Sequence, residues 1–321
     1  MTEDFYKYQA QTTPHPLALE ISHAEGSYIY DTSGKKHLDF VAGVSACTLG
    51  HCHPRVVAAI KNQVEKYLHV MVYGEYIQEA AVELAKLLSE NLPKSLNTTY
   101  LVNSGTEAIE GSLKLARRAT GSTQILYANN AYHGNTMGSM SVMGYEERKN
   151  AFKPLVPDCF PVNFNNEADL QKITSETAAI ILETIQGGET LLILDEIQPG
   201  FGRTGKLFAF EHFGIAPDIL VMGKGMGGGL PIGAFTASHE VMTLLQDNPK
   251  LGHITTFGGN PVIAAAALAT LRELTETDII EQTLQKEKLF RKLLVHPLIK
   301  EVRGRGLMLA VIMETPEIAS E

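Results

Sequence analysis

The sequence is poor in cysteine, lacks tryptophan and has no long apolar run. Its three cysteines, Cys47, Cys52 and Cys159, form no CxxC pair, which argues against a disulfide framework and suits a reducing compartment. The apolar runs are too short to cross a bilayer, and the start MTEDFYKYQAQ lacks the apolar core of a signal peptide. We therefore expect a cytoplasmic protein.

Basic residues are scarce relative to acidic ones. The chain carries 27 Lys and Arg against 36 Asp and Glu, a net charge of −9, without a Lys/Arg-rich block. This balance argues against nucleic acid and anionic membranes as partners. The stretch GHCHP at 50–54 has no matching second pair of metal ligands, so we interpret it as a turn before an amphipathic segment over 56–68 and predict no metal site.

What is present is typical of a globular protein of roughly two domains: 321 residues, 44% of them hydrophobic. The segment 26–40 predicts two short strands joined by a turn, and the last segment begins with a helix at 260 and ends with a strand near 306–314. Between them, predicted helices over 78–93 and 106–121 alternate with strands at 98–103, 123–129, 178–183, 191–196 and 218–223. This alternation predicts an α/β fold with a mostly parallel sheet and helices on both faces.

One connection in this pattern is unusually short. Only the seven residues 184–190 separate Glu183 from Leu191, whereas a crossover between parallel strands needs about a dozen or more. Either these two strands are not parallel, or part of the natural chain is absent from the sequence; we favour absence.

A single lysine, Lys224, stands in the glycine-rich stretch PDILVMGKGMGGGLPIGAF at 217–235. A P-loop needs Ser or Thr after its lysine, and Gly225 is there instead. GKGMGG matches GxGxxG, but a dinucleotide fingerprint must open a helix, which the following glycines and Pro231 oppose. A solvated lysine and a catalytic one both remain open on this stretch alone.

The other polar residues at the ends of predicted strands favour a catalytic lysine. Asn103, Glu183, Asp195 and Lys224 all lie at or just past such ends and are expected to share one site. A lysine that forms a Schiff base with pyridoxal phosphate needs a carboxylate facing the ring nitrogen. Asp195 directly follows an apolar run, where a carboxylate is costly unless it has a cationic partner.

The same cofactor also needs donors for its phosphate and an aromatic ring to stack on it. Ser104 and Glu107 have the S-x-x-E spacing of a capping box, with Gly105 and Thr106 between them. Such a helix start can hold a phosphate, although capping alone explains the outer two residues. Tyr132 offers an aromatic ring in the loop after a predicted strand, where ordinary packing is an equal explanation.

Taken together, these motifs resemble the class III pyridoxal-phosphate aminotransferases of fold type I, the acetylornithine, ornithine and 4-aminobutyrate group. The motifs that carry the resemblance are GSYIYDTSGKKHLDFVAGV, LGHCHP, VNSGTEAIEGSLKLAR, AYHG, LLILDEIQPGFGRTGKLFAFEHFGIAPDIL, GKGMGGGLPIGA and TTFGGNP. The resemblance implies a large cofactor-binding domain over 47–262 and a smaller α+β domain formed by 1–46 and 263–321. DEIQPGFGRTGK also speaks against the aminomutase branch.

The resemblance further implies a role for each site residue. Lys224 would bind the cofactor and move the substrate proton, and Asp195 would pair with the ring nitrogen. The other implied cofactor contacts are Gln198 to the ring oxygen, Ser104, Gly105 and Thr106 to the phosphate, Tyr132 and His133 at the ring, Glu183 and Gln186 near the substrate, and Thr256 to the phosphate of the neighbouring subunit. The site would therefore straddle a homodimer interface.

The implied activity is ping-pong transfer of an amino group between an amine or ω-amino acid and a 2-oxo acid, in amino-acid metabolism. A lyase or racemase of the same family, a catalytically impaired cofactor-binding homologue and, more distantly, a nicotinamide-dependent dehydrogenase are the alternatives. Two departures leave the substrate open. Asn135 stands where many relatives have a carboxylate-binding arginine, and relatives continue beyond the position of Glu321 through segments that carry another such arginine. If those segments and the short connection are true deletions, we expect activity to be lost.

Overall fold

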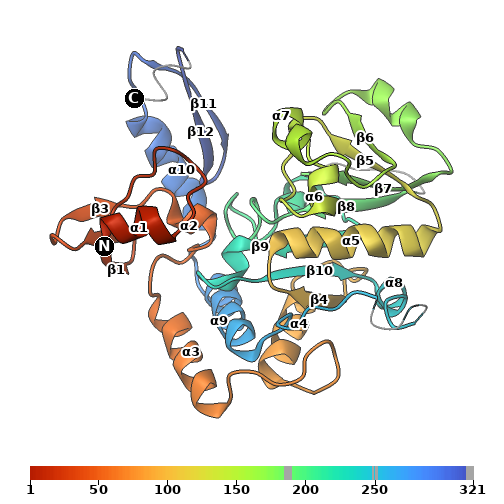
Figure 1. The fold of residues 1–321 in the computed structure, drawn as a ribbon, viewed down its shortest axis with the longest axis horizontal. Coiled ribbons are helices and arrows are strands. Elements are labelled where there is room, and N and C mark those ends of the chain that lie inside the picture. Colours follow the sequence, from red (N-terminus) through yellow and green to blue (C-terminus); the bar gives the residue numbers. More distant parts are fainter. Residues whose placement is uncertain (184–189, 248, 250–251, 316–321) are drawn as a thin grey trace.

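The computed structural model describes residues 1–183, 190–247, 249 and 252–315. Within these ranges a seven-stranded sheet lies at the centre, in the order β4-β10-β9-β8-β7-β5-β6 (Figure 1). Its strands are β4 (Thr98–Val102), β5 (Gln124–Ala128), β6 (Cys159–Val162), β7 (Thr177–Leu182), β8 (Leu191–Asp195), β9 (Ile219–Gly223) and β10 (Gly233–Ala237). Only β10 runs against the others, since it pairs antiparallel with both β4 and β9. The predicted mostly parallel sheet is confirmed.

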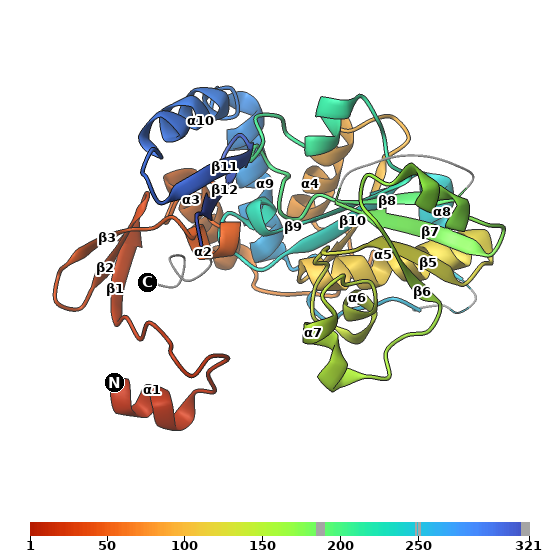
Figure 2. The ribbon, with the colours of Figure 1, turned by 90° about the horizontal axis from the view of Figure 1, so that it is seen from above.

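Helices cover both faces of this sheet, as predicted. The longer ones are α3 (Pro54–Lys66), α4 (Glu79–Glu90), α5 (Gly105–Thr120), α9 (Pro261–Glu276) and α10 (Gln282–Leu293). Figure 2 shows α5 on one side of the sheet and α4 and α9 on the other. Side chains alternate along each strand. In β7, Ile180 and Leu182 join the core cluster that includes α4 and α9, whereas Ile181 joins the cluster that includes α5.

The helix α5 illustrates why these residues form this element. Ser104 caps its start by accepting a hydrogen bond from the Glu107 N–H, and Gly121 ends it in the left-handed conformation that glycine adopts readily. Ile109 and Leu113, four residues apart, are buried on one face of the helix. Each such side chain contributes about 1.5–3 kcal/mol on burial, so the helix is held firmly against the strands whose ends carry the site.

The first strands of the chain and its last described helix and hairpin lie at the same side of the molecule (Figures 1 and 2). The three-stranded sheet of β1 (Ile21–Glu25), β2 (Tyr28–Asp31) and β3 (Lys36–Leu38) sits beside α10 and the hairpin of β11 (Ile299–Arg305) and β12 (Met308–Met313). The rings of Phe40 and Phe290 join them, with centroids 5.9 Å apart. The division into domains at 46/47 and 262/263 stays a prediction.

Shorter elements complete the described part of the chain. They are the helices α1 (Thr2–Tyr8), α2 (Ala42–Ser45), α6 (Met137–Ser141), α7 (Glu146–Lys149) and α8 (His239–Thr243), and the 3-10 turns η1 (Asn150–Phe152), η2 (Glu167–Lys172), η3 (Ala209–Phe213) and η4 (Lys224–Gly227). In the ranges that the structure covers, no helix is both long and apolar enough to span a membrane.

Several local predictions are confirmed and others need correction. All five strands predicted for the central sheet are present, and α3 begins at Pro54, the last residue of GHCHP. The sequence pattern missed β6 and β10, whose sequences CFPV and GAFTA lack a distinctive apolar run. The possibility that the strands on either side of the short connection are not parallel is wrong: β7 and β8 pair in parallel, with Leu182 opposite Leu194. Residues 184–189 lie outside the described residues.

Candidate active site

Polar side chains gather at the carboxyl edge of the central sheet. The strands β4, β5, β7, β8 and β9 all end there, because they run in the same direction. Asp195 is the last residue of β8, and Lys224 directly follows β9. The site residues that follow the other three strands are Ser104, Tyr132, His133 and Glu183. This is the edge at which open α/β sheets bind their ligands.

Asp195 is a buried carboxylate with two fixed partners. Its Oδ2 lies 2.7 Å from Nδ1 of His133, and the two side chains are 5% and 0% exposed. Its Oδ1 accepts a hydrogen bond of 3.0 Å from the N–H of Ile197. The sequence predicted a cationic partner for this carboxylate, and the structure places an imidazole there. In the described part of the molecule the other ring nitrogen of His133, Nε2, is buried without a partner.

Lys224 sits in a tight turn with its amine aimed at Gln198. Its backbone has a φ of +42°, which is uncommon for a residue with a side chain. Its Nζ donates a hydrogen bond to Oε1 of Gln198, and Nε2 of Gln198 donates to Oγ of Ser45 at 2.9 Å. Burial lowers the pKa of Lys224, which the charges of Asp195 and Glu183 partly offset. A lowered pKa leaves more of the amine neutral and therefore nucleophilic.

The glycines beside Lys224 are explained by close backbone approach. A Cβ on Gly225 would lie 2.8 Å from Oγ1 of Thr48, and one on Gly223 would lie 3.3 Å from Cα of Gly105. The turn after β9 is thus pressed against the start of α5, and any larger residue there would push the two apart.

The N-terminus of α5 forms a second corner of the site. Besides the Ser104 cap, the carboxylate of Glu107 reaches back to the N–H of Asn103 at 2.9 Å. The predicted capping box is therefore present in a shifted form. A Cβ on Gly105 would lie 2.6 Å from Cδ1 of Ile197. The first N–H groups of a helix have no partner within the helix, so this end can bind an anion.

Thr106 takes part in a small hydroxyl cluster. Its Oγ1 lies 2.6 Å from Oγ of Ser139 and 2.9 Å from Oγ1 of Thr136. Glu110 accepts hydrogen bonds from the N–H groups of Gly138 and Ser139, at 2.8 and 3.2 Å. These bonds fix the loop after His133 against the start of α5.

Tyr132 and Glu183 lie together at the open side of the site. The N–H of Tyr132 donates to Oε1 of Glu183 at 3.2 Å, and the tyrosine side chain is 39% exposed. The protein around Glu183 desolvates its carboxylate and raises its pKa. Thr256 is exposed, as is Asn135. Gln186 lies outside the described residues.

Two contacts of the site were not anticipated from the sequence. Ser45, which holds Gln198, comes from the N-terminal part of the chain and has a φ of +67°. Glu196 is fully buried, and its carboxylate accepts hydrogen bonds from the N–H groups of Ala209 and Phe210, at 2.9 and 2.8 Å. A second acid directly after a buried strand was the available signal for Glu196, whereas nothing in the sequence marks Ser45.

The arrangement fits pyridoxal phosphate. That molecule carries an aldehyde, a ring nitrogen and a phosphate at different positions of one flat ring, and needs an amine, a carboxylate and anion donors. Here the amine of Lys224, the buried carboxylate of Asp195 and the start of α5 at Gly105 occupy one sheet edge. There is no room for a Cβ at Gly105. This fits a helix start whose N–H groups must stay accessible to a phosphate.

Comparison with known proteins agrees with this geometry. The family model described as "Aminotransferase class-III" matches residues 8–190 and 188–320. The chain belongs to the class III aminotransferase family. It is 40% identical to the acetylornithine aminotransferase of Methanopyrus kandleri, over 89% of this chain and 79% of that protein. It is 37% identical to the [LysW]-aminoadipate semialdehyde/glutamate semialdehyde transaminase of Sulfolobus acidocaldarius, over 91% and 81%.

Solved structures of other class III aminotransferases share the fold. The ornithine aminotransferase of Toxoplasma gondii ME49 superposes with a TM-score of 0.87 at 30% identity, covering 98% of this chain and 82% of that one. The adenosylmethionine-8-amino-7-oxononanoate aminotransferase of Methanocaldococcus jannaschii gives 0.88 at 30% identity, covering 100% and 85%. The chain is thus a fold type I enzyme of the aminotransferase class. The named relatives favour transamination over the lyase and racemase alternatives.

Proposed function

We propose that this class III aminotransferase binds pyridoxal phosphate at Lys224 and moves an amino group between an amine or ω-amino acid and a 2-oxo acid. The observation that carries the proposal is the placement of Asp195 and Lys224 at the ends of the adjacent strands β8 and β9, with buried His133 bound to Asp195 and half-buried Gln198 bound to Lys224. A second solved structure of the T. gondii ornithine aminotransferase is described as having partial occupancy of PLP at its active site, which supports the choice of cofactor.

Each residue then has a defined task. When bound, the cofactor supplies a ring that withdraws electrons from the substrate carbon. Asp195 holds positive charge at the ring nitrogen, and His133 fixes the orientation of Asp195 through their 2.7 Å contact. The N–H groups at Gly105 and Thr106 would hold the phosphate. Tyr132 would stack on the ring, and Gln198 would bind its oxygen.

Lys224 does the acid–base work. Its amine has a lowered pKa because it is buried, so it gives and takes a proton at Nζ near neutral pH more readily than an exposed lysine. Gln198 holds Nζ in place until a ligand replaces that contact. Because donor and acceptor substrates use the same amine in turn, we expect ping-pong kinetics.

Cofactor binding is tested by titrating the protein with pyridoxal phosphate and then adding borohydride. We expect a visible absorption band and, after reduction and digestion, a mass increase on the peptide that contains Lys224. Lys224→Ala should lose both, while Lys206→Ala, which removes an exposed lysine of the neighbouring loop, should keep both. Folded wild-type protein without the band would refute the proposal.

The donor is identified by a substrate panel. Acetylornithine is the first candidate because several relatives act on it, followed by ornithine, 4-aminobutyrate and simple amines, each with 2-oxoglutarate or pyruvate. Transamination predicts that product forms only when an oxo-acid acceptor is present. Product without an acceptor would favour a lyase or racemase instead.

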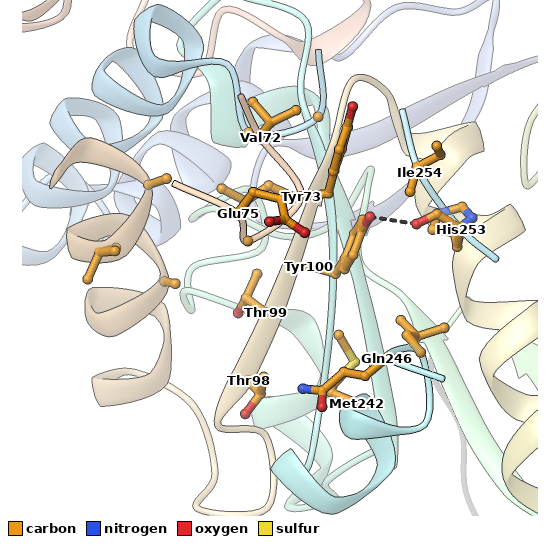
Figure 3. Close-up of a pocket in the computed structure, with 18 of the residues that line it drawn as sticks. Val72, Tyr73, Glu75, Thr98, Thr99, Tyr100, Met242, Gln246, His253 and Ile254 are labelled. Atoms are coloured by element: carbon orange, nitrogen blue, oxygen red, sulfur yellow. Dashed lines mark hydrogen bonds between the residues drawn. The ribbon is translucent and has the colours of Figure 1, made fainter. Parts of the chain in front are cut away.

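A homodimer with shared sites is part of the proposal. A cavity of about 740 Å³ lies along the outer edge of β4, where the sheet has no further strand in the described ranges (Figure 3). Its wall includes Tyr76 and Tyr100. It also includes Ile254 and Gly258, which lie on either side of the exposed Thr256 in the sequence. Sheet edges with apolar surroundings are usually covered, and a second copy covering this one would bring its Thr256 toward its partner.

The dimer is tested by light scattering. Tyr76 is 64% exposed in this cavity, so Tyr76→Asp should produce monomers and weaken cofactor binding. The matched control is Tyr8→Asp on α1, a tyrosine that is 74% exposed elsewhere. A monomeric wild type would contradict a shared site.

A cofactor-binding protein with impaired turnover is a second candidate. The observation that favours it is the short connection between β7 and β8, which is also where the family match breaks into two parts. Such a protein would give the absorption band and the Lys224 label but no product with any donor. A cytoplasmic location stays a prediction.

A further inference from the structure

A groove beside the site is rich in arginine. It has a volume of about 560 Å³ and lies between the loop after β8, the N-terminal segment near Phe40 and the β11–β12 hairpin. Its lining residues are Phe40, Val41, Ala42, Ser45, Gln198, Arg203, Thr204, Arg303, Gly304, Arg305, Leu307, Met308, Leu309 and Ala310. Three arginines and no acid are among these described residues, in a chain whose net charge is −9.

Arg203 is the cation that most needs an anion. Its guanidinium is partly buried, and its single hydrogen bond within the described residues goes to Oγ1 of Thr48 at 3.4 Å. It forms no salt bridge in the part of the chain that the structure covers. Burial lowers the pKa of Arg203. A desolvated charge without a counter-ion is costly, so a bound anion would relieve that cost.

The other two arginines differ in how far they are already neutralised. Nε of Arg303 lies 2.7 Å from Oε2 of Glu301, in an exposed pair. Arg305 is exposed and has no ion pair among the described residues. Arg203 therefore provides the inner cation of the groove and Arg305 an outer one.

The groove reaches the hydrogen-bond partner of the reactive amine. Gln198 and Ser45 form part of its wall, and Gln198 accepts the hydrogen bond from Nζ of Lys224. Burial lowers the pKa of Lys224, and the charge of Arg203 contributes in the same direction. A molecule in the groove therefore lies between Arg203 and Gln198, the residue that binds the Lys224 amine.

The rest of the wall is apolar. Phe40 and Val41 are 71% and 65% exposed although they line the groove, and Leu307 and Leu309 face it from the hairpin. Apolar walls with a cation at one end match a ligand with an aliphatic stem and a terminal anion.

We propose that this groove is the carboxylate subsite of the enzyme, with Arg203 as the group that binds the carboxylate of an aliphatic ω-amino acid while its amine lies at Lys224. The proposal rests on the proposed function for the identity of the reacting amine. It would give this chain a carboxylate receptor other than the arginine that the resemblance implies at the position of Asn135. It also assigns a specificity-determining role to a loop residue that no local sequence pattern marks.

Direct binding tests the groove without any turnover. Glutarate, a dicarboxylate with no amine, is titrated calorimetrically into the cofactor-treated protein. Arg203→Gln should weaken its binding by roughly tenfold to a hundredfold, as expected for losing a charge-assisted hydrogen bond. The matched control Arg272→Gln removes a surface arginine that pairs with Glu83 at 3.7 Å and should leave binding within about twofold. Equal binding to wild type and Arg203→Gln would overturn the proposal.

A matched pair of donors tests specificity. Arg203→Gln should lower kcat/KM for 5-aminopentanoate by roughly tenfold to a hundredfold. For n-pentylamine, which has no carboxylate, the loss should be less than about threefold. Arg203→Lys should recover part of the loss for 5-aminopentanoate. Equal losses for both donors would show a general defect and refute a carboxylate subsite.

Two further outcomes keep the test decisive. If circular dichroism shows that Arg203→Gln does not fold, Arg305→Gln on the exposed hairpin takes its place, with an expected weakening of glutarate of roughly twofold to fivefold; no change would then refute the proposal. If wild type fails to take up pyridoxal phosphate, the proposed function fails, while the glutarate comparison still decides whether Arg203 binds a carboxylate.

Discussion

Replacing His133 with leucine should destabilise the protein through the carboxylate it leaves behind. The 2.7 Å contact with Asp195 is almost completely buried, and the remaining bond of that carboxylate in the described structure comes from the N–H of Ile197 at 3.0 Å. A hydrogen bond to a charged group contributes about 1.5–3 kcal/mol, and an unsatisfied buried group adds to the loss. We therefore expect the free energy of unfolding to fall by at least about 1.5 kcal/mol.

A double-mutant cycle measured by urea unfolding separates this effect from lost packing. Asp195→Asn removes the charge, so His133→Leu should cost less in that background, by about 1 kcal/mol or more. His37→Leu is the matched control. Its ring lies 2.9 Å from Asp31, but the two side chains are 28% and 13% exposed, so its loss should stay below about 1 kcal/mol. Effects at 133 and 195 that add within about 0.5 kcal/mol would refute the coupling.

Three further changes probe the rest of the site. Gly105→Ala would put a Cβ 2.6 Å from Cδ1 of Ile197, so it should weaken pyridoxal phosphate binding in a fluorescence titration. Adding Ile197→Val should restore part of the binding. If it restores none, the steric cause is contradicted. Ser104→Ala removes the cap of α5 and should cost about 1 kcal/mol on urea unfolding, with no loss arguing against the cap. Burial lowers the pKa of Lys224 below its ordinary value of 10.5. Between the pKa of the folded state and that of the unfolded state, the unfolded chain binds more protons, so the free energy of unfolding should rise with pH in this range. Lys224→Met should flatten this part of the pH profile, and an unchanged slope would contradict the assignment.

The parts of the fold that local pattern determines were predictable. Apolar runs such as 177–182 and 191–195 form strands that are buried on both faces, and α5 begins at a cap and ends at a glycine, so each of these elements is specified by its own residues. Asp195 was found because a charge after a buried run needs a partner. The reversed strand β10 was missed, since its sequence GAFTA is small and follows a glycine-rich turn.

The parts that depend on distant segments meeting were not predictable. His133 and Asp195 are 62 positions apart, and Ser45 and Gln198 are 153 apart. Only the packing of β5 near β8, and of the N-terminal segment over the loop after β8, creates these contacts. The arginine groove depends in the same way on the β11–β12 hairpin lying beside Arg203. No local pattern encodes such pairings.

The central claim is that Lys224 and Asp195 serve two ends of one bound cofactor. A crystal structure of the protein loaded with pyridoxal phosphate tests it most directly. The account predicts density continuous with Nζ of Lys224 and a ring nitrogen within hydrogen-bonding distance of an Asp195 oxygen. A ring bound elsewhere, or one whose nitrogen points away from Asp195, would contradict it.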